Sequence, residues 1–287
     1  MMKSKEVITY LVLMVAASSC FYAPMLKQHS IYAGGGTLWL MWCPGFAGIV
    51  TALIFRRNLK GFGWLPGNLK WLLLAYFIPI AYSLVTYSVI WTSGLGGFPN
   101  PAYLKDVLSR FPQATVALSV ARHLLDLMVI SFIPGLLKPL GEEIGWRGFL
   151  VPQLSKTFSY AKVSIIVGII WAVWHYPAIL CTDYNIGTPA WCAIPCFTIL
   201  VIEVSFVSAW LRLRSKSLWP CVLLHSSHNA IVQEFFTPIT IDKGYTKFFI
   251  DEFGVGLVIA AGVVAWLFWK HRDSIGNQCF QSHSLQK

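Results

Sequence analysis

Residues 162–180 read KVSIIVGIIWAVWHYPAIL, and this stretch decides the class of fold. After Lys162 it contains no Lys, Arg, Asp or Glu. A helix of about 20 mostly apolar residues is long enough to cross a bilayer. The stretch therefore predicts a membrane-spanning helix that carries one histidine, His175, within it.

The same pattern recurs along the chain. Seven further apolar stretches are long enough to be spans: 7–26, 38–55, 70–91, 116–137, 190–211, 218–236 and 253–270. Hydrophobic residues make up 56% of the 287 residues and charged residues 12%, with a mean hydropathy of +0.62. Soluble domains carry about 25% charged residues. We therefore predict an all-α, multi-pass transmembrane bundle of about eight helices.

The net charge of +10 is a signal of topology. If the N-terminus is cytoplasmic, most Lys and Arg residues fall in loops on that same side, as the positive-inside rule requires. We therefore expect a cell-membrane protein with both termini in the cytoplasm, the lipid bilayer as its surroundings and no nucleic-acid partner. The first stretch also fits a signal peptide, but it continues to Leu26, which favours an uncleaved span.

Outside the spans, three features carry smaller predictions. Residues 102–112 have apolar side chains at helical spacing, which fits a short helix on the outer membrane surface or, equally, an ordered loop. Residues 271–287 form a polar tail. The seven cysteines show no spacing of a disulfide framework or thiolate metal site, and Cys192 and Cys196, on one helix face, fit packing.

Ionisable side chains inside a bilayer are costly, so each marks a candidate functional site. The strongest cluster follows the fourth stretch, where Glu142, Glu143 and Arg147 lie among apolar residues. On a helix Glu143 and Arg147 can pair, whereas Glu142 is rotated by about 100° and can face a cavity. A buried carboxyl beside a like charge is suited to take a proton from water. A purely structural ion pair is the competing interpretation.

Two later spans add polar groups to this cluster. His175 lies in one, and His225 and Asn229 share a helix face in the next but one, with His228 near that face. An amide and an imidazole on one face can donate two hydrogen bonds to one oxygen, as an oxyanion hole requires. A lone buried histidine more often only packs, so the combination carries this prediction.

Four other polar residues within the spans have a weaker claim to function. Arg122 and Asp126 are four residues apart and are expected to neutralise each other. Glu203 and Glu234 are candidates for supporting or channel positions, and structural pairing explains them equally well.

Together these segments resemble the CPBP intramembrane proteases. This family includes the CAAX prenyl endopeptidases of the Ras-converting type and bacterial proteins linked to bacteriocin processing or self-immunity. The shared features are Glu-Glu-x-x-x-Arg at 142–147, an aromatic residue four positions before His at 171–175, and His-x-x-x-Asn at 225–229. Trp171 stands where the family commonly has Phe. The resemblance covers about residues 115–236.

The resemblance implies an intramembrane endopeptidase that cleaves a membrane-associated or lipidated peptide or protein. It implies that Glu142 activates water with help from His175, and that His225 and Asn229 stabilise the oxyanion. The residues expected to support them are Glu143 and Arg147, with His228 and Trp171 as secondary candidates.

Family members have also been described as metalloproteases. In that case Glu142, His175 and His225 would be the zinc ligands, because zinc accepts imidazole nitrogen and carboxylate oxygen. The two-histidine pair of a zincin helix is absent, because Asn229 stands at the second position and Asn is a poor zinc ligand. We therefore favour a site without a cofactor and keep zinc as the alternative.

We divide the single membrane domain into three parts. Residues 1–114 hold the N-terminal spans and loops, residues 115–236 the CPBP-like catalytic core, and residues 237–287 the last span and cytoplasmic tail. Two other functions remain open: a non-catalytic immunity or scaffold protein of the same fold, and a proton-coupled transporter. The absence of a visible internal repeat weakens the transporter.

Overall fold

The computed structural model describes residues 2–275, and their regular structure is helical apart from one backbone bridge between Gly97 and Ile241. The predicted tail from residue 276 onward lies outside these residues. Helices lie at all eight predicted spans. Five in this part of the chain are long and apolar enough to cross a bilayer alone: α1 (Met2–Gln28), α2 (Thr37–Arg56), α3 (Leu69–Thr92), α9 (Tyr160–Cys181) and α10 (Ala190–Ser215).

The fourth predicted span, 116–137, covers the first arm of a bent pair of helices and the start of the second arm. The first arm comprises α5 (Val116–Leu125) and the π-helix η2 (Asp126–Ile130). The second arm comprises α6 (Phe132–Gly135), α7 (Leu137–Glu143), the π-helix η3 (Ile144–Leu150) and α8 (Val151–Leu154). The arms meet at 51° near Ser131. Pro134 lies just beyond the bend, where a proline cannot donate its backbone hydrogen bond. The two adjacent glutamates therefore lie inside the second arm.

The last two predicted spans are also shorter or segmented. Helix α11 (Trp219–His228) continues through the π-helix η5 (Asn229–Phe236) into α12 (Thr237–Ile239). Helix α13 (Val255–Lys270) has 16 residues. At 1.5 Å per residue it is about 24 Å long, less than the roughly 30 Å of a hydrocarbon core.

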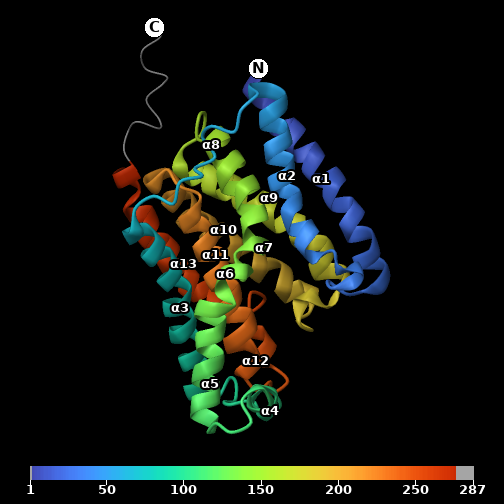
Figure 1. The fold of residues 1–287 in the computed structure, drawn as a ribbon, viewed down its shortest axis with the longest axis vertical. Helices are drawn as coiled ribbons and strands as arrows, with labels where there is room; N and C mark the ends of the chain where they lie inside the picture. Colours follow the sequence, from blue (N-terminus) through green and yellow to red (C-terminus); the bar gives the residue numbers. More distant parts are fainter. Residues whose placement is uncertain (1, 276–287) are drawn as a thin grey trace.

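The helices are arranged in a bundle whose middle is formed by α9, α10 and α11 (Figure 1). The α1–α2 pair lies on one side of these three helices, and α3 and α13 lie on the other. The start of α1 and the end of α13 lie at the same end of the bundle. That arrangement agrees with termini on one side of a membrane, and which side that is stays a prediction.

The expected short helix near residue 102 is confirmed as α4 (Pro101–Arg110). The Asn100 side chain accepts a hydrogen bond from the backbone N–H of Ala102, which caps its first turn. Helix α4 lies beside α5, at the end of the bundle away from the N-terminus (Figure 1). Its position on a membrane surface remains a prediction.

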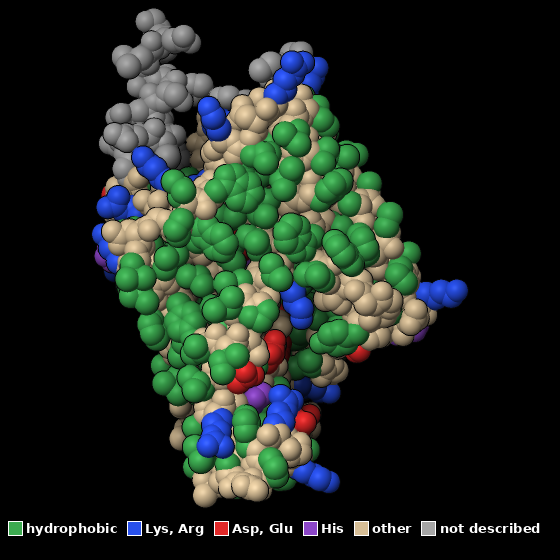
Figure 2. Space-filling model, viewed as in Figure 1, with side chains coloured by type: hydrophobic (Ala, Val, Ile, Leu, Met, Phe, Trp, Pro, Cys, Tyr) green, Lys and Arg blue, Asp and Glu red, His purple; other side chains and the backbone are tan. Residues whose placement is uncertain are grey.

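The outer surface separates into apolar and charged zones (Figure 2). Hydrophobic side chains cover most of the face shown, whereas Lys and Arg gather at the end that holds the N-terminus. Acidic, basic and histidine side chains gather at the opposite end, below a hollow in this face. A wide apolar surface is what lipid contact requires of a spanning bundle.

Glycines on both helices let the second arm of the bent pair pack closely against α2. A Cβ added to Gly145 would lie 2.4 Å from the Pro44 carbonyl carbon, and one added to Gly45 would lie 2.4 Å from the Gly141 oxygen. Gly141 and Gly145 are four residues apart, the spacing at which small residues let membrane helices approach closely. The segment that carries Glu142 is therefore packed closely against α2.

The expected ion pair between Arg122 and Asp126 is not formed. Asp126 accepts a hydrogen bond from the Ser131 hydroxyl, while the Arg122 guanidinium lies 6.0 Å from the centroid of the Phe111 ring. The prediction assumed α-helical geometry through residue 126. That geometry is present, since the backbone N–H of Asp126 donates to the Arg122 carbonyl oxygen, but the two side chains take the separate partners just described.

Candidate active site

The predicted site residues surround a cavity of about 270 Å³ between the helices. Six of them line it: Glu142, Trp171, His175, His225, His228 and Asn229. They come from α7, α9, α11 and the start of η5. The cavity is large enough for several water molecules. The structure therefore brings together residues that are almost 90 positions apart in the sequence.

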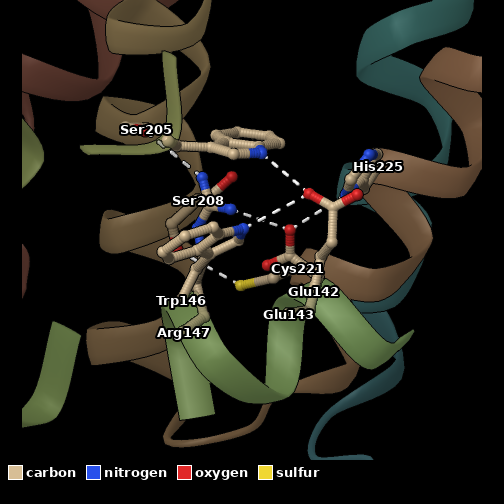
Figure 3. Close-up of polar contacts among 9 residues, drawn as sticks. Glu142, Glu143, Trp146, Arg147, Ser205, Ser208, Cys221 and His225 are labelled. Atoms are coloured by element: carbon tan, nitrogen blue, oxygen red, sulfur yellow. Dashed lines mark hydrogen bonds and ion pairs between the residues drawn. The ribbon is translucent and has the colours of Figure 1, made fainter. Parts of the chain in front are cut away.

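Glu142 is the first of three carboxylates that line this cavity. It is 1% exposed, and its Oε2 accepts hydrogen bonds from Trp171 Nε1 at 2.8 Å and from Trp146 Nε1 at 3.3 Å (Figure 3). Both donors are indole N–H groups, which can only donate. Two indoles therefore fix one carboxylate oxygen of Glu142.

Glu143 and Arg147 lie behind the cavity wall and are fully buried. Arg147 Nη1 donates to Glu143 Oε1 at 2.8 Å, and Arg147 Nη2 donates to Ser205 Oγ at 3.3 Å (Figure 3). The guanidinium carbon also lies 4.3 Å from the centroid of the Trp171 ring. A buried pair needs this kind of surrounding contact to offset the loss of hydration. The expected pairing of these two residues is present.

His225 links this pair to the cavity. Its Nδ1 lies 3.1 Å from Glu143 Oε1, and its ring packs edge-on against Trp171 with centroids 5.2 Å apart. Because Arg147 compensates the Glu143 carboxylate, His225 Nδ1 is the natural donor to it. The other ring nitrogen, Nε2, is left for a group in the cavity.

The orientation of His175 is fixed by its own helix. Its Nδ1 lies 3.0 Å from the Trp171 carbonyl oxygen. A carbonyl can only accept, so Nδ1 carries the proton and Nε2 is the atom that can take one. Its ring also packs against Trp174, Tyr184 and Phe197.

Asn229 is the first residue of η5 and is half-buried at the cavity wall. Within residues 2–275 its side chain forms no hydrogen bond with the protein. Its amide is therefore free to meet a molecule in the cavity. Asn229 and His225 both line the cavity, as their spacing predicted.

His228 is engaged on both ring nitrogens. Its Nδ1 contacts the Tyr82 hydroxyl, and its Nε2 lies 3.0 Å from Glu252 Oε1. Glu252 Oε2 in turn accepts a hydrogen bond from the Tyr184 hydroxyl at 2.9 Å. Sequence reasoning missed Tyr82, Tyr184 and Glu252. The signal for Glu252 was present, because two adjacent carboxylates, at 251 and 252, lie beside the last apolar stretch as those at 142 and 143 lie beside the fourth.

The other two carboxyl candidates are placed differently. Glu234 lines the cavity. Glu203 does not line it; its Oε1 would lie 2.8 Å from a Cβ added to Gly262 of α13, and its buried Oε2 has no hydrogen-bond partner. Only Glu234 is therefore placed to contact a molecule in the cavity.

The donors around Glu142 do not form a zinc site in this arrangement. Across residues 2–275, no three His, Cys, Asp or Glu side chains lie close enough together to hold a metal ion. Glu142 Oε2 faces two indole donors, and His225 Nδ1 faces Glu143. The six described cysteines are free, and Cys192 and Cys196 lie with their sulfurs 3.9 Å apart. The donors around Glu142 are therefore arranged for hydrogen bonds to one another and do not fit a zinc ion.

Comparison with known proteins identifies a related segment around this cavity. Residues 124–231 match the family model described as type II CAAX prenyl endopeptidase, Rce1-like. CAAX prenyl protease 2 of Methanococcus maripaludis is 32% identical over 130 residues, which cover 44% of this chain and 45% of that protein. The alignment therefore spans less than half of either chain. Glu142, His175, His225 and Asn229 all lie within the matched segment.

Proposed function

Residues 124–231 are an Rce1-like segment of the CPBP family, and on this basis we propose that the chain is an intramembrane endopeptidase. Its substrate is a membrane-associated or lipidated peptide or protein. The observation that carries the proposal is the position of Glu142, a carboxylate buried among apolar residues and facing a cavity that His175, His225 and Asn229 also line. Such a site can hold a water molecule and a peptide carbonyl together.

Glu142 is the group that activates water. As the water oxygen forms its bond to the peptide carbonyl carbon, one water proton passes to the Glu142 carboxylate. The indoles of Trp146 and Trp171 keep the carboxylate in place during this step. His175 assists by accepting a hydrogen bond from the same water through Nε2, the ring atom left free by its contact with the Trp171 carbonyl.

The negative charge then moves to the carbonyl oxygen and must be stabilised there. Asn229 donates to this oxyanion through its free amide. His225 donates through Nε2 when both ring nitrogens carry protons, a state that the Glu143 carboxylate at Nδ1 can compensate. When the carbon–nitrogen bond breaks, Glu142 returns its proton to the departing amine and a new carboxylate remains.

The proposed substrate class follows from the relative and from the lining of the cavity. The name of the relative specifies a CAAX prenyl substrate for that protein, and in such a C-terminal Cys-a-a-X sequence the lipid is attached to the Cys, three residues before the end. In this chain Lys138 lines the cavity one turn before Glu142. Its ammonium suits the C-terminal carboxylate of such a substrate, and the aromatic and aliphatic walls suit its lipid.

The proposal is tested with purified protein in lipid vesicles and a peptide that ends in a prenylated CAAX sequence. Mass spectrometry in ¹⁸O-labelled water should detect a shortened peptide with the label in its new carboxylate. The same peptide without the lipid is the matched control for substrate class. Failure to cleave either peptide, or any membrane-anchored peptide of a cell extract, would reject the protease and favour a scaffold or immunity protein.

The zinc-dependent version is separated by a second measurement. Metal content of the purified protein is determined by mass spectrometry, and activity is measured before and after chelation. The metal-free site predicts full activity after chelation without stoichiometric zinc. Zinc at one per chain, lost together with activity, would replace the metal-free mechanism by a zinc-dependent one.

A further inference from the structure

A second set of polar side chains lies at the same cavity and has no part in the chemistry above; three of its four members line the cavity, and Tyr82 contacts one of these three. We call it the His228 chain, and it consists of Tyr82, Tyr184, His228 and Glu252. Glu252 is its centre, because one carboxylate oxygen meets His228 Nε2 at 3.0 Å and the other accepts from the Tyr184 hydroxyl at 2.9 Å. His228 and Glu252 are 6% and 8% exposed. Buried polar groups that are satisfied in this way fix each other's orientation.

The backbone holds Glu252 in place. The preceding residue, Asp251, has a φ of 59°, in the left-handed region that residues other than glycine seldom enter. Asp251 Oδ1 accepts from the backbone N–H of Glu252 at 2.7 Å, and the backbone N–H of Asp251 donates to the Tyr87 hydroxyl at 3.1 Å. Such a conformation persists where its surroundings determine it. The Glu252 side chain is therefore presented to the cavity by a fixed turn.

The His228 chain reaches the proposed catalytic residues through Tyr184. The Tyr184 ring stacks on the His175 ring with centroids 5.9 Å apart and planes 20° apart. Its hydroxyl is held by Glu252, and its ring packs edge-on against Phe253 at 5.3 Å. One face of His175 is thus covered by a ring that Glu252 orients. The Glu252 carboxylate and the His175 ring line the same cavity.

We propose that Glu252 is a positioning residue for His175, which holds Tyr184 against the imidazole and sets a compensating negative charge near it. A base whose orientation is fixed by a third group is a recurring device in hydrolytic sites. Here the third group acts through an aromatic ring. The inference rests on the proposed role of His175. It differs from a purely structural role in that the charge of Glu252, and not only its shape, matters.

The contact itself is tested without any cleavage. Histidine labelled with ¹³C at Cε1, in protein reconstituted in lipid nanodiscs, gives resonances for the seven histidines of the chain. The variant His175→Gln identifies the resonance of His175. Loss of the stacked ring in Tyr184→Leu should shift this resonance strongly, whereas Tyr184→Phe, which keeps the ring, should shift it less. Glu252→Gln should also shift it, and an unmoved resonance would overturn the proposal.

The consequence for the reaction is tested with kcat and KM. Glu252→Gln keeps the size of the side chain, replaces one accepting oxygen by an amide NH2 and removes the charge. We expect kcat to fall about 10-fold with KM changed less than about twofold and the unfolding temperature unchanged. An unchanged kcat would overturn the positioning role. A lower kcat together with a lower unfolding temperature would also overturn it, because loss of folding would then explain the loss of activity. If Glu252→Gln does not accumulate, Tyr184→Phe carries the same test, since it loses only the hydroxyl bound to Glu252.

These two arms separate the inference from the proposed function. A wild-type protein that cleaves no peptide would reject the protease, and the resonance of His175 would still decide whether Glu252 orients it. A protease whose Glu252→Gln variant retains full kcat would reject only the positioning role.

Discussion

Trp171 Nε1 donates a hydrogen bond to Glu142 Oε2 at 2.8 Å, from one turn before His175 on α9. The sequence showed only that an aromatic residue stands at this position. A phenylalanine has no polar atom and could not form this bond. Trp171 also packs against His225 and carries the Arg147 guanidinium over its ring. One indole thus contacts Glu142, Arg147 and His225.

The first prediction concerns this indole. The substitution Trp171→Phe keeps an aromatic ring but removes the donor to Glu142. A hydrogen bond to a charged group contributes about 1.5–3 kcal/mol, so kcat/KM should fall by about 10-fold or more. The measurement is peptide cleavage by purified protein in vesicles. Trp146→Phe, which removes the longer bond of 3.3 Å, should cost less; equal losses would mean that the bond lengths do not reflect function.

The second prediction concerns the oxyanion. Asn229→Ala should lower kcat by about 10²–10³-fold, the typical loss when one oxyanion donor is removed, with little change in KM. Stability should be unaffected, because the Asn229 side chain makes no hydrogen bond within the described chain. Ser226→Ala is the matched control, since this residue also lines the cavity and its buried hydroxyl has no partner. Full activity in Asn229→Ala would remove Asn229 from the mechanism.

The third prediction concerns the close contact between α2 and η3. Gly145→Ala places a Cβ 2.4 Å from the Pro44 carbonyl carbon, so one backbone must move. Overpacking of this kind costs about 1–3 kcal/mol, and it displaces the helix that carries Glu142. Both the unfolding temperature and the cleavage rate should fall. Gly135→Ala, whose Cβ meets nothing within 4 Å, should leave the unfolding temperature unchanged.

The fourth prediction compares two ion pairs on this chain. Arg147→Ala leaves Glu143 buried and without its main partner, which costs about 3–5 kcal/mol of unfolding free energy. Arg110→Ala breaks an exposed pair with Asp106 and should cost at most about 1 kcal/mol. Denaturant titration of both variants in detergent measures the difference. Equal stability of the two variants would contradict the proposed supporting role of the buried pair.

Hydropathy predicted where the helices lie, because membrane insertion depends on summed apolar length. It did not predict the bend at Ser131 or the π-helical stretches η3 and η5. These depend on which backbone carbonyl each N–H reaches, and that is decided by packing against other helices. The expected pair of Arg122 with Asp126 failed because the Arg122 guanidinium lies over the Phe111 ring and Asp126 accepts from Ser131.

The polar residues of the site were predictable where the chain places them at helical spacing. Glu143 with Arg147 and His225 with Asn229 are such pairs. Trp146 also stands at helical spacing from Glu142, but its role was missed. The contacts of Trp171 with Glu142 and of Glu252 with His228 join side chains on different elements, which no local pattern shows. The glycines of the Gly-Glu-Glu-Ile-Gly stretch were also missed, because their partner is the distant backbone of α2.

The central claim is that Glu142 activates the water that cleaves the peptide bond. The direct measurement is the rate of peptide cleavage by Glu142→Gln in lipid vesicles, compared with the rate of the wild-type protein. Both proteins are used at the same concentration, and equal unfolding temperatures show that the variant is folded. Glutamine can still accept from Trp171 but cannot take a proton, so turnover should fall by at least about 10²-fold. Wild-type turnover in a folded Glu142→Gln protein would contradict the claim.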